Sequence, residues 1–285
     1  MALEIERANG IGFCFGVRRA IDLLVKAAGE YGAIETMGAV VHNQPVVEKL
    51  KGIGVTIAET IGDIKGTRVA IRSHGVSPDE EVELRARNIE IIDTTCPFVH
   101  RAQIAAKRLA EAGFFTVIFG DALHPEIKSV MGWAQGRGIA TLDAEALKKQ
   151  GIIPRRLGVL SQTTQIPEKF NAFVKGIIDT ALVKDSELRI IDTICHDIRE
   201  RQAAALSLAR RVDTMFVIGG HNSANTHHLF DLCAGVTKTH LVETTGEIEP
   251  SWLTGHRHVG VTSGASTDDE TIDEVVARLK YLAEA

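Results

Sequence analysis

Short apolar runs alternate with amphipathic stretches along the whole chain. The runs are rich in β-branched residues and end at glycine or polar clusters, a pattern typical of buried parallel strands. They predict strands around Leu3 and Ile5 and at Arg68–Ser73, Ile89–Asp93, Phe114–Gly120, Arg156–Ser161, Leu188–Asp192, Thr214–Gly219 and Arg257–Ser263.

The stretches between these runs predict helices. In Arg18–Gly32 apolar residues recur at helical spacing, and the stretch ends on a glycine, a common C-terminal cap. Ser77 with Glu80, and Thr267 with Glu270, have the spacing of capping boxes at two further helix starts. Strands that alternate with helices in this way predict an α/β fold with mostly parallel sheets.

An internal repeat suggests how the chain is organised. Ile91–Cys96 reads IIDTTC and Ile190–Cys195 reads IIDTIC, so each cysteine follows a predicted strand. Cys14, in GFCFGV, also follows a strand, after a turn broken by glycine. Because open α/β sheets bind ligands at the carboxyl ends of their strands, we expect three related α/β units around a centre. Approximate segments are 1–97, 98–193 and 194–285, and each contributes one cysteine to a shared cavity.

Composition excludes several classes of function. The formal net charge is −5, without the basic excess expected of a nucleic-acid-binding protein. No apolar run approaches the ~18 residues that a membrane-spanning helix needs. The first residues, MALEIERANG, alternate as a strand does and do not resemble a signal or transit peptide. We therefore expect a cytoplasmic protein that binds neither nucleic acid nor membranes.

The cysteines admit three interpretations. Disulfides are rare in a cytosolic chain, which favours metal binding or catalysis for thiols in unusual settings. Zinc sites and ferredoxin clusters usually use cysteines close together in sequence, and Cys14, Cys96 and Cys195 are far apart. They could also be buried hydrophobic residues, although the repeat at a strand exit favours a shared metal or cluster site. Cys233 lies on an apolar helical stripe and is predicted to belong to the core.

An ordered set of motifs resembles one enzyme family. GFCFGVRRAI, VVHNQPVV, SHGVS, DTTCP, HPE with MGW, SQTT, DTIC, NSAN and GAS occur in this order over nearly the whole chain. Together they resemble 4-hydroxy-3-methylbut-2-enyl diphosphate reductase, the LytB/IspH family.

The resemblance implies both a fold and a reaction. It implies a trefoil of three α/β units around an iron–sulfur cluster of the 4Fe–4S type, with three protein ligands and one open iron. The ligands it implies are Cys14, Cys96 and Cys195. The implied reaction removes the allylic hydroxyl of the diphosphate substrate, giving isopentenyl and dimethylallyl diphosphate plus water, the last step of the methylerythritol phosphate route. Phe13 and Phe15 are then expected to shield the cluster from water.

A diphosphate bound by an acidic protein needs local donors. Imidazoles at strand ends and hydroxyl or amide groups beside helix starts, where free backbone N–H groups favour anions, meet this need. The predicted substrate-binding residues are His42, His74, His124, Thr163, Ser223, Asn225 and Ser266.

Glu126 is the candidate catalytic acid. It is the only carboxylate beside one of these histidines in a strand-exit loop, and loss of water requires a proton on the leaving oxygen. We expect Glu126 to supply that proton through Thr163 or through the substrate's own diphosphate.

Some positions differ from the family pattern. Ala224 stands where the second serine of a Ser-Ser-Asn motif is usual, and His196 stands where tyrosine commonly follows the third cysteine. Lys128 and Ser129 replace small residues, and Thr267 stands where a proline is common. These changes keep one alternative open, namely that the chain is a diverged paralogue that acts on another small diphosphate.

Two other classes of function also remain open. A cluster-dependent hydratase or dehydratase would need the same three cysteines without net electron transfer, and a non-catalytic sensor would bind metal and an anion without turnover. A reductase would need an external electron donor. Since no G-x-G-x-x-G dinucleotide motif follows a strand, a separate ferredoxin or flavodoxin is expected.

Overall fold

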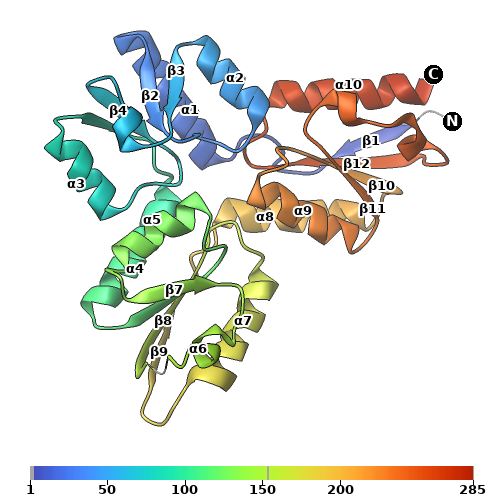
Figure 1. Ribbon diagram of the computed structural model, residues 1–285. Coiled ribbons are helices and arrows are strands. Elements are labelled where there is room, and N and C mark those ends of the chain that lie inside the picture. The colour runs from blue at the N-terminus through green and yellow to red at the C-terminus, as the bar shows by residue number, and fades with distance from the viewer. Residues whose placement is uncertain (1–2, 153, 285) are drawn as a thin grey trace. The chain divides into compact units, whose positions relative to one another are not determined.

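A computed structural model describes residues 3–152 and 154–284 and contains three four-stranded sheets (Figure 1). Every strand pair in the three sheets is parallel. The chain divides into two compact units, which are described separately. The first comprises Met1–Arg18, Val41–Ile53 and His196–Ala285, and the second comprises Arg19–Val40 and Gly54–Cys195.

The first unit contains one sheet, in the order β1-β12-β10-β11. Its strands are β1 (Glu4–Arg7), β10 (Thr214–Ile218), β11 (Lys238–Val242) and β12 (His258–Ser263). Its helices are α2 (Gln44–Gly52), α8 (His196–Ala209), α9 (Ala224–Ala234) and α10 (Asp269–Glu284), with short 3-10 turns at Thr245–Glu247 and Pro250–Leu253. Helix α1 (Phe15–Tyr31) begins in this unit and ends in the second.

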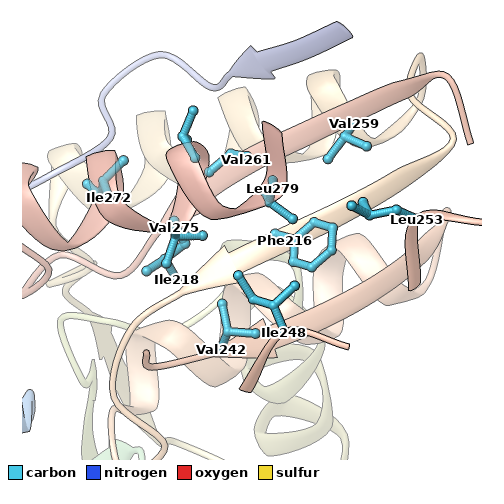
Figure 2. Close-up of a cluster of buried hydrophobic side chains, with 11 residues drawn as sticks. Phe216, Ile218, Val242, Ile248, Leu253, Val259, Val261, Ile272, Val275 and Leu279 are labelled. Atoms are coloured by element: carbon cyan, nitrogen blue, oxygen red, sulfur yellow. The ribbon is translucent and has the colours of Figure 1, made fainter. Parts of the chain in front are cut away.

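A hydrophobic core covers one face of this sheet. Figure 2 shows side chains of β10, β12 and α10 pointing toward one another, with Phe216 of β10 among them. Phe216 is fully buried, as are Val275 and Leu279 of α10, which are spaced one helical turn apart. One apolar face of α10 therefore forms the core contact with the sheet.

The second unit contains two sheets. The first has the order β3-β2-β4-β5 and the second β7-β6-β8-β9. The strands are β2 (Ile34–Met37), β3 (Val55–Ala58), β4 (Arg68–Ile71), β5 (Glu90–Asp93), β6 (Phe115–Phe119), β7 (Gly138–Thr141), β8 (Arg156–Ser161) and β9 (Glu187–Ile190). The helices are α3 (Pro78–Ala86), α4 (Pro97–Glu111), α5 (Pro125–Trp133), α6 (Ala146–Lys149) and α7 (Pro167–Ala181), with a 3-10 turn at Ile61–Asp63.

Proline sets the starts of several helices. It occupies the first turn of α2, α3, α4, α5 and α7. Proline suits this position because its fixed φ matches the helix and its missing N–H would be unpaired there anyway. The loop before each of these helices therefore has a defined end, which positions the side chain just ahead of the proline.

The same topology recurs in the three sheets. Read from the edge that carries a cysteine loop, the strand orders are β5-β4-β2-β3, β9-β8-β6-β7 and β1-β12-β10-β11. The strand that precedes each cysteine is therefore an edge strand, and its neighbour occupies an equivalent position in each sheet. The predicted α/β class, the parallel sheets and the pseudo-equivalence of the three sheets are confirmed.

The pairing of β1 and the presence of four additional strands differ from the sequence-based expectations. The N-terminal strand β1 pairs with β12, with Glu4 opposite His258, so it joins the sheet formed by the end of the chain. The division at residues 97/98 and 193/194 stays a prediction. All the predicted strands are present, but β2, β3, β7 and β11 were not predicted, because they are short and mix polar with apolar residues.

One predicted helix cap is confirmed and the other is wrong. The Ser77 hydroxyl and the Glu80 carboxylate form the expected capping box at α3. At α10 the cap hydrogen bond is made by the carboxylate of Asp268, which accepts from the N–H of Thr271 at 2.9 Å. Thr267 is fully buried and donates to the carbonyl of Ile218 instead.

In the part of the chain that is described, no helix has both the length and the apolar character that crossing a bilayer demands.

Candidate functional site

Cys14, Cys96 and Cys195 each lie immediately before a helix. Helix α1 begins at Phe15 and α8 begins at His196, and Cys96 is the N-cap residue of α4. The first N–H groups of a helix and its dipole favour negative charge, so each thiol is placed where a thiolate is stabilised.

The backbone of each cysteine bonds to the loop after the neighbouring strand. The N–H of Cys14 donates to Ala265 O at 3.0 Å, beside Ser266. The equivalent bonds run from Cys96 to Ser73 O and from Cys195 to Thr163 O, both at 2.9 Å. Ser73 precedes His74, so each cysteine loop is attached to a loop that carries a predicted substrate-binding residue.

The repeated D-T-x-C motif makes the same hydrogen bonds in both places. The Thr94 hydroxyl donates to Ile71 O, and the Thr193 hydroxyl donates to Ser161 O. Both threonines are buried, and each bonds to the last residue of the neighbouring strand. The motif is therefore a structural device that joins two strand ends ahead of a cysteine.

The Cys14 loop achieves a similar result with different residues. Gly12, two residues before the cysteine, adopts a φ of +92°, which favours glycine. Its N–H donates to the Ser263 hydroxyl at 2.9 Å, and the N–H of Val17 approaches the Cys14 sulfur at 3.5 Å. Burial raises the pKa of the Cys14 thiol, while the Val17 bond and the charge of Arg201 act to lower it.

Cys233 belongs to the core, as predicted. It is fully buried with Leu229 and other apolar residues of the first unit. Burial raises the pKa of its thiol to about 12, so this thiol stays protonated at neutral pH.

The expected shielding of the cluster by Phe13 and Phe15 stays a prediction. The side chain of Phe15 is 59% exposed. Phe15, Phe13 and Cys14 line a pocket of about 580 Å³ in the first unit, together with Asp197 and Arg201.

His124 and Glu126 are fixed by the first turn of α5. His124 is the N-cap residue, and its Nδ1 accepts the N–H of Glu126 at 3.1 Å. Because Nδ1 acts as an acceptor, the proton of the neutral ring is on Nε2. This ring can therefore donate one hydrogen bond from Nε2.

Glu126 and Thr163 form a buried pair. One carboxylate oxygen accepts the Thr163 N–H at 2.7 Å and the other accepts the Thr163 hydroxyl at 2.7 Å. Glu126 is only 2% exposed, and burial raises the pKa of its carboxyl although both Thr163 bonds act to lower it. A raised pKa is what a proton donor at neutral pH requires.

A continuous set of contacts joins the predicted residues of the second unit. The rings of His74 and His124 meet edge to face, with centroids 5.2 Å apart. His124 caps the helix that carries Glu126, and Glu126 binds Thr163, whose carbonyl accepts from Cys195. The second unit therefore brings these predicted residues together.

The predicted residues of the first unit are arranged differently. Ser223 caps α9, with its hydroxyl accepting the N–H of Thr226 at 3.4 Å. Asn225 is 5% exposed, and within residues 3–152 and 154–284 neither Oδ1 nor Nδ2 of its amide has a hydrogen-bond partner. Ser266 is buried beside Ala265. A buried amide without a partner is costly unless a ligand binds it.

His42 lies at the start of the loop before α2 and is partly buried. Its carbonyl packs so closely against Gly220, in the loop after β10, that a side chain at that position would collide with it. The His42 loop is thus held against the loop that leads to Ser223.

The residues that differ from the family pattern make none of the contacts described above, or they stabilise the fold. His196 is exposed and pairs with Glu200 at 3.1 Å, and Lys128 is exposed. Ser129 is buried and accepts from Gln103 at 2.8 Å. Ala224 is the first residue of α9, where its N–H is one of the free donors of the helix start.

The sequence-based interpretation missed several residues that shape these loops. Arg201, in α8, is 4% exposed and donates to Gly12 O at 2.7 Å and to Ser263 O at 3.0 Å. No signal marks it, because HDIRERQ resembles an ordinary solvated helix start. The roles of Thr94 and Thr193, in contrast, could have been inferred from their exact repetition ahead of two cysteines.

The donor set suits an iron–sulfur group. Thiolates are the ligands that such clusters use, and the three thiols precede helices at equivalent positions in the three sheets. Cys14 and Cys96 are partly exposed and Cys195 is 7% exposed.

Comparison with known proteins gives full-length matches. The profile of the family described as "LytB protein" matches residues 5–280. A protein of Dehalococcoides mccartyi (strain CBDB1) named 4-hydroxy-3-methylbut-2-enyl diphosphate reductase is 59% identical over 281 residues, 99% of each chain. A protein of Geobacter metallireducens with the same name is 39% identical over 284 residues, also 99% of each.

Solved structures resemble the chain over a similar extent. A structure of (E)-4-hydroxy-3-methyl-but-2-enyl diphosphate reductase, "the terminal enzyme of the non-mevalonate pathway", is 34% identical with a TM-score of 0.71, covering 98% of this chain and 99% of that one. The E-1-hydroxy-2-methyl-but-2-enyl-4-diphosphate reductase from Plasmodium falciparum has a TM-score of 0.90 at 22% identity, covering 97% and 88%, and shows the same fold.

Proposed function

The chain belongs to the LytB protein family, and from that premise we propose that it reduces 4-hydroxy-3-methylbut-2-enyl diphosphate to isopentenyl and dimethylallyl diphosphate. The resemblance inferred from the motifs is confirmed by the full-length matches, and relatives up to 59% identical carry the name of this reductase. The family is an iron–sulfur oxidoreductase family of isoprenoid biosynthesis.

One structural observation carries the site assignment. Each of Cys14, Cys96 and Cys195 precedes a helix and donates its N–H to a strand-exit loop that bears a predicted substrate residue. A packing cysteine has no reason to recur with this arrangement in three sheets, whereas three ligands of one group would need it. We therefore assign these thiolates as the ligands of a 4Fe–4S cluster with one open iron.

The bound cluster would supply electrons and a Lewis-acidic iron next to the substrate hydroxyl. Overall, the carbon–oxygen bond of the allylic alcohol breaks, two electrons and two protons are taken up, and water leaves. The chain's own residues must therefore bind the diphosphate, orient the hydroxyl and supply a proton to the leaving oxygen.

The diphosphate would be held by imidazole, amide and hydroxyl groups. His42, His74 and His124 supply imidazoles, and in the neutral His124 ring Nε2 carries the proton because Nδ1 accepts from the helix. Asn225 offers an amide that has no partner among the described residues. Bonds of this kind to a charged acceptor contribute about 1.5–3 kcal/mol each, and Ser223 and Ser266 would add hydroxyl donors.

The proton would pass from Glu126 through Thr163. The buried carboxyl has a raised pKa and is bonded to the Thr163 hydroxyl at 2.7 Å. A protonated Glu126 can donate to the threonine oxygen while the threonine O–H donates to the substrate hydroxyl. The helix start at Pro125 and the cap by His124 hold the carboxyl in place for this transfer.

We also propose that the electron donor is a separate ferredoxin or flavodoxin, and that the reaction takes place in the cytoplasm, where free thiols stay reduced. Neither proposal affects the assignment of the residues.

The test is turnover after anaerobic reconstitution with iron and sulfide. With a reduced donor, the protein should convert the hydroxylated allylic diphosphate into both products, and conversion should stop when the donor is omitted. Turnover that continues without reductant would instead identify a hydratase or dehydratase. Tight diphosphate binding without any product, by a protein that has assembled its cluster, would identify a sensor.

A further inference from the structure

Arg201 is a buried cation that the sequence did not single out and the reaction described above does not use. It lies in the second turn of α8 with its side chain 4% exposed. Burying a guanidinium is unfavourable unless good hydrogen bonds compensate for the lost hydration. Its position near Cys14 therefore calls for an explanation.

The guanidinium bridges two segments that meet beside Cys14. One nitrogen donates to Gly12 O at 2.7 Å, and the other donates to Ser263 O at 3.0 Å. Ser263 also accepts the Gly12 N–H on its hydroxyl at 2.9 Å. Both backbone groups of Gly12 are thus bound, two residues ahead of the cysteine.

The other two cysteine loops use threonine for the same connection. Thr94 and Thr193 stand two residues before their cysteines and bond to the last residue of the adjacent strand. Ser263 is the equivalent last residue of β12, but the position two before Cys14 is a glycine without a side chain. In the Cys14 loop, Arg201 of α8 therefore connects the loop to the end of the adjacent strand. In the other two loops a threonine of the loop itself makes this connection.

Arg201 also affects the charge of the site. The guanidinium binds Gly12 O, two residues before Cys14, and lines the same pocket as Cys14, so a fixed positive charge lies in the surroundings of this sulfur. Asp197 lines this pocket as well and contributes a negative charge. A cluster that takes up one electron becomes more negative, and a fixed cation close to its ligand favours that state.

Cys96 has a related but weaker neighbour. Arg19 donates to Thr95 O at 3.2 Å, and its side chain is only partly buried. Water screens such a charge more than it screens Arg201. The larger effect is therefore expected at Cys14.

We propose that Arg201 is a positioning residue for Cys14, holding its loop in the ligating shape and favouring the reduced cluster through its fixed charge. This rests on the proposed function only in taking Cys14 as a cluster ligand.

The test compares three variants after anaerobic reconstitution. Arg201→Met removes the charge and the bridge, whereas Arg201→Lys keeps the charge but cannot span both carbonyl groups in the same way. Arg210→Met is the matched control, because it also removes one positive charge, from an exposed position just beyond the end of α8. The measurements are the midpoint potential of the cluster, the rate of iron release to a chelator, and thermal unfolding.

The variants distinguish the effect of the Arg201 charge from the effect of its hydrogen-bonded bridge. At the wild-type midpoint potential, Arg201→Met should lower the ratio of reduced to oxidised cluster about tenfold, a shift of about 59 mV for a one-electron couple. Arg201→Lys should keep a potential close to wild type yet release iron several-fold faster. Arg210→Met should match wild type in both.

Different failures have different meanings. If Arg201→Met reduces at the wild-type potential, the charge effect is absent, and if Arg201→Lys releases iron at the wild-type rate, the bridge has no positioning role; either result overturns the proposal. If Arg201→Met does not fold, Arg201→Lys alone decides through its release rate. A wild-type protein that assembles no cluster would instead refute the proposed function.

Discussion

The predicted site residues of the second unit form a chain of contacts, whereas in the first unit one predicted residue, Asn225, is buried without a hydrogen-bond partner for its amide among the described residues. In the second unit, contacts run from His74 to His124, on to Glu126 and Thr163, and then to Cys195. In the first unit, the buried amide of Asn225 has no partner among the described residues.

This difference indicates two roles for the buried polar groups. A buried polar network that is satisfied internally fixes the geometry and proton affinity of its members before substrate arrives. A buried polar group that lacks a partner costs stability until a ligand bonds to it. We infer that Glu126 and Thr163 of the second unit are organised for proton transfer, and that the Asn225 amide of the first unit is available for binding the diphosphate. Substitutions in the two units should therefore divide between turnover, affinity and stability.

The largest effect is expected for Glu126→Gln. The amide cannot hand a proton to Thr163, so kcat should fall about 10²–10⁴-fold while substrate affinity changes little. Rates measured with a reduced donor, together with the absorbance and EPR of the cluster, check this.

Glu168→Gln is the matched control for that variant. Glu168 also follows a proline in the first turn of a helix, α7, but its side chain is exposed. Its replacement should leave kcat unchanged. Near-normal turnover by Glu126→Gln would remove the proton role from this carboxyl.

Asn225→Ala should weaken substrate binding without lowering the stability of the fold. Loss of the amide should weaken substrate binding about 10- to 100-fold, equivalent to roughly 1.5–3 kcal/mol, because the lost bonds go to a charged group. The free energy of unfolding without substrate should not fall, since the amide makes no hydrogen bond among the described residues. Calorimetric binding and denaturant unfolding measure the two quantities. A variant that binds as well as wild type but unfolds more easily would contradict the binding role of Asn225.

Thr193→Val should show the opposite behaviour. The Thr193 hydroxyl donates to Ser161 O and accepts the Ser161 N–H at 2.9 Å, so valine leaves two buried backbone groups unpaired. The free energy of unfolding should fall by about 1–3 kcal/mol. Thr56→Val, at an exposed position of β3, should change it by less than about 0.5 kcal/mol. Equal unfolding curves for the two variants would show that the repeated threonine does not stabilise its loop.

The raised pKa of Glu126 also predicts a pH dependence of stability. The folded protein holds this proton at pH values where the unfolded chain has released it, so the folded state binds more protons and stability falls as pH rises through that interval. Glu126→Gln lacks this loss. Its free energy of unfolding, relative to wild type, should therefore increase from about pH 5 to about pH 8. A difference that stays constant with pH, or decreases, would contradict the raised pKa.

The smallest effect is expected for Ala224→Ser. A hydroxyl at the first position of α9 adds one donor beside Ser223 and should strengthen substrate binding by about 1 kcal/mol, roughly fivefold. Ala203→Ser, at an exposed position of α8, is a control with the same chemical change and should have no effect on affinity. No gain from Ala224→Ser would show that the backbone N–H of Ala224 already suffices.

The sequence predicted the parts of the fold that depend on local patterns. Apolar runs identified the buried strands, and Ser77 with Glu80 identified a helix start. The pairing of β1 with β12 depends on residues at opposite ends of the chain, so no local pattern could indicate it. At α10, Thr267 has the spacing of a cap but is buried against Ile218, so the tertiary contact overrides the local preference.

The candidate site was predictable where motifs repeat and not where one residue substitutes for another. The repeated D-T-x-C marked Cys96 and Cys195, the position of Cys14 after a strand and a glycine turn placed it with them, and the family resemblance implied that all three are ligands. Arg201 could not be found in this way, because its role depends on a glycine in a distant loop. That the Asn225 amide has no partner among the described residues likewise depends on packing, which no local pattern indicates.

The central claim is that three distant cysteines ligate one cluster, and iron binding by cysteine variants tests it most directly. After anaerobic reconstitution the wild type and Cys233→Ala should each hold about four irons and four sulfides per chain. Cys14→Ser, Cys96→Ser and Cys195→Ser should each lose most of the cluster or its native EPR signal. The account is contradicted if any of these three keeps a wild-type cluster, or if Cys233→Ala loses it while remaining folded.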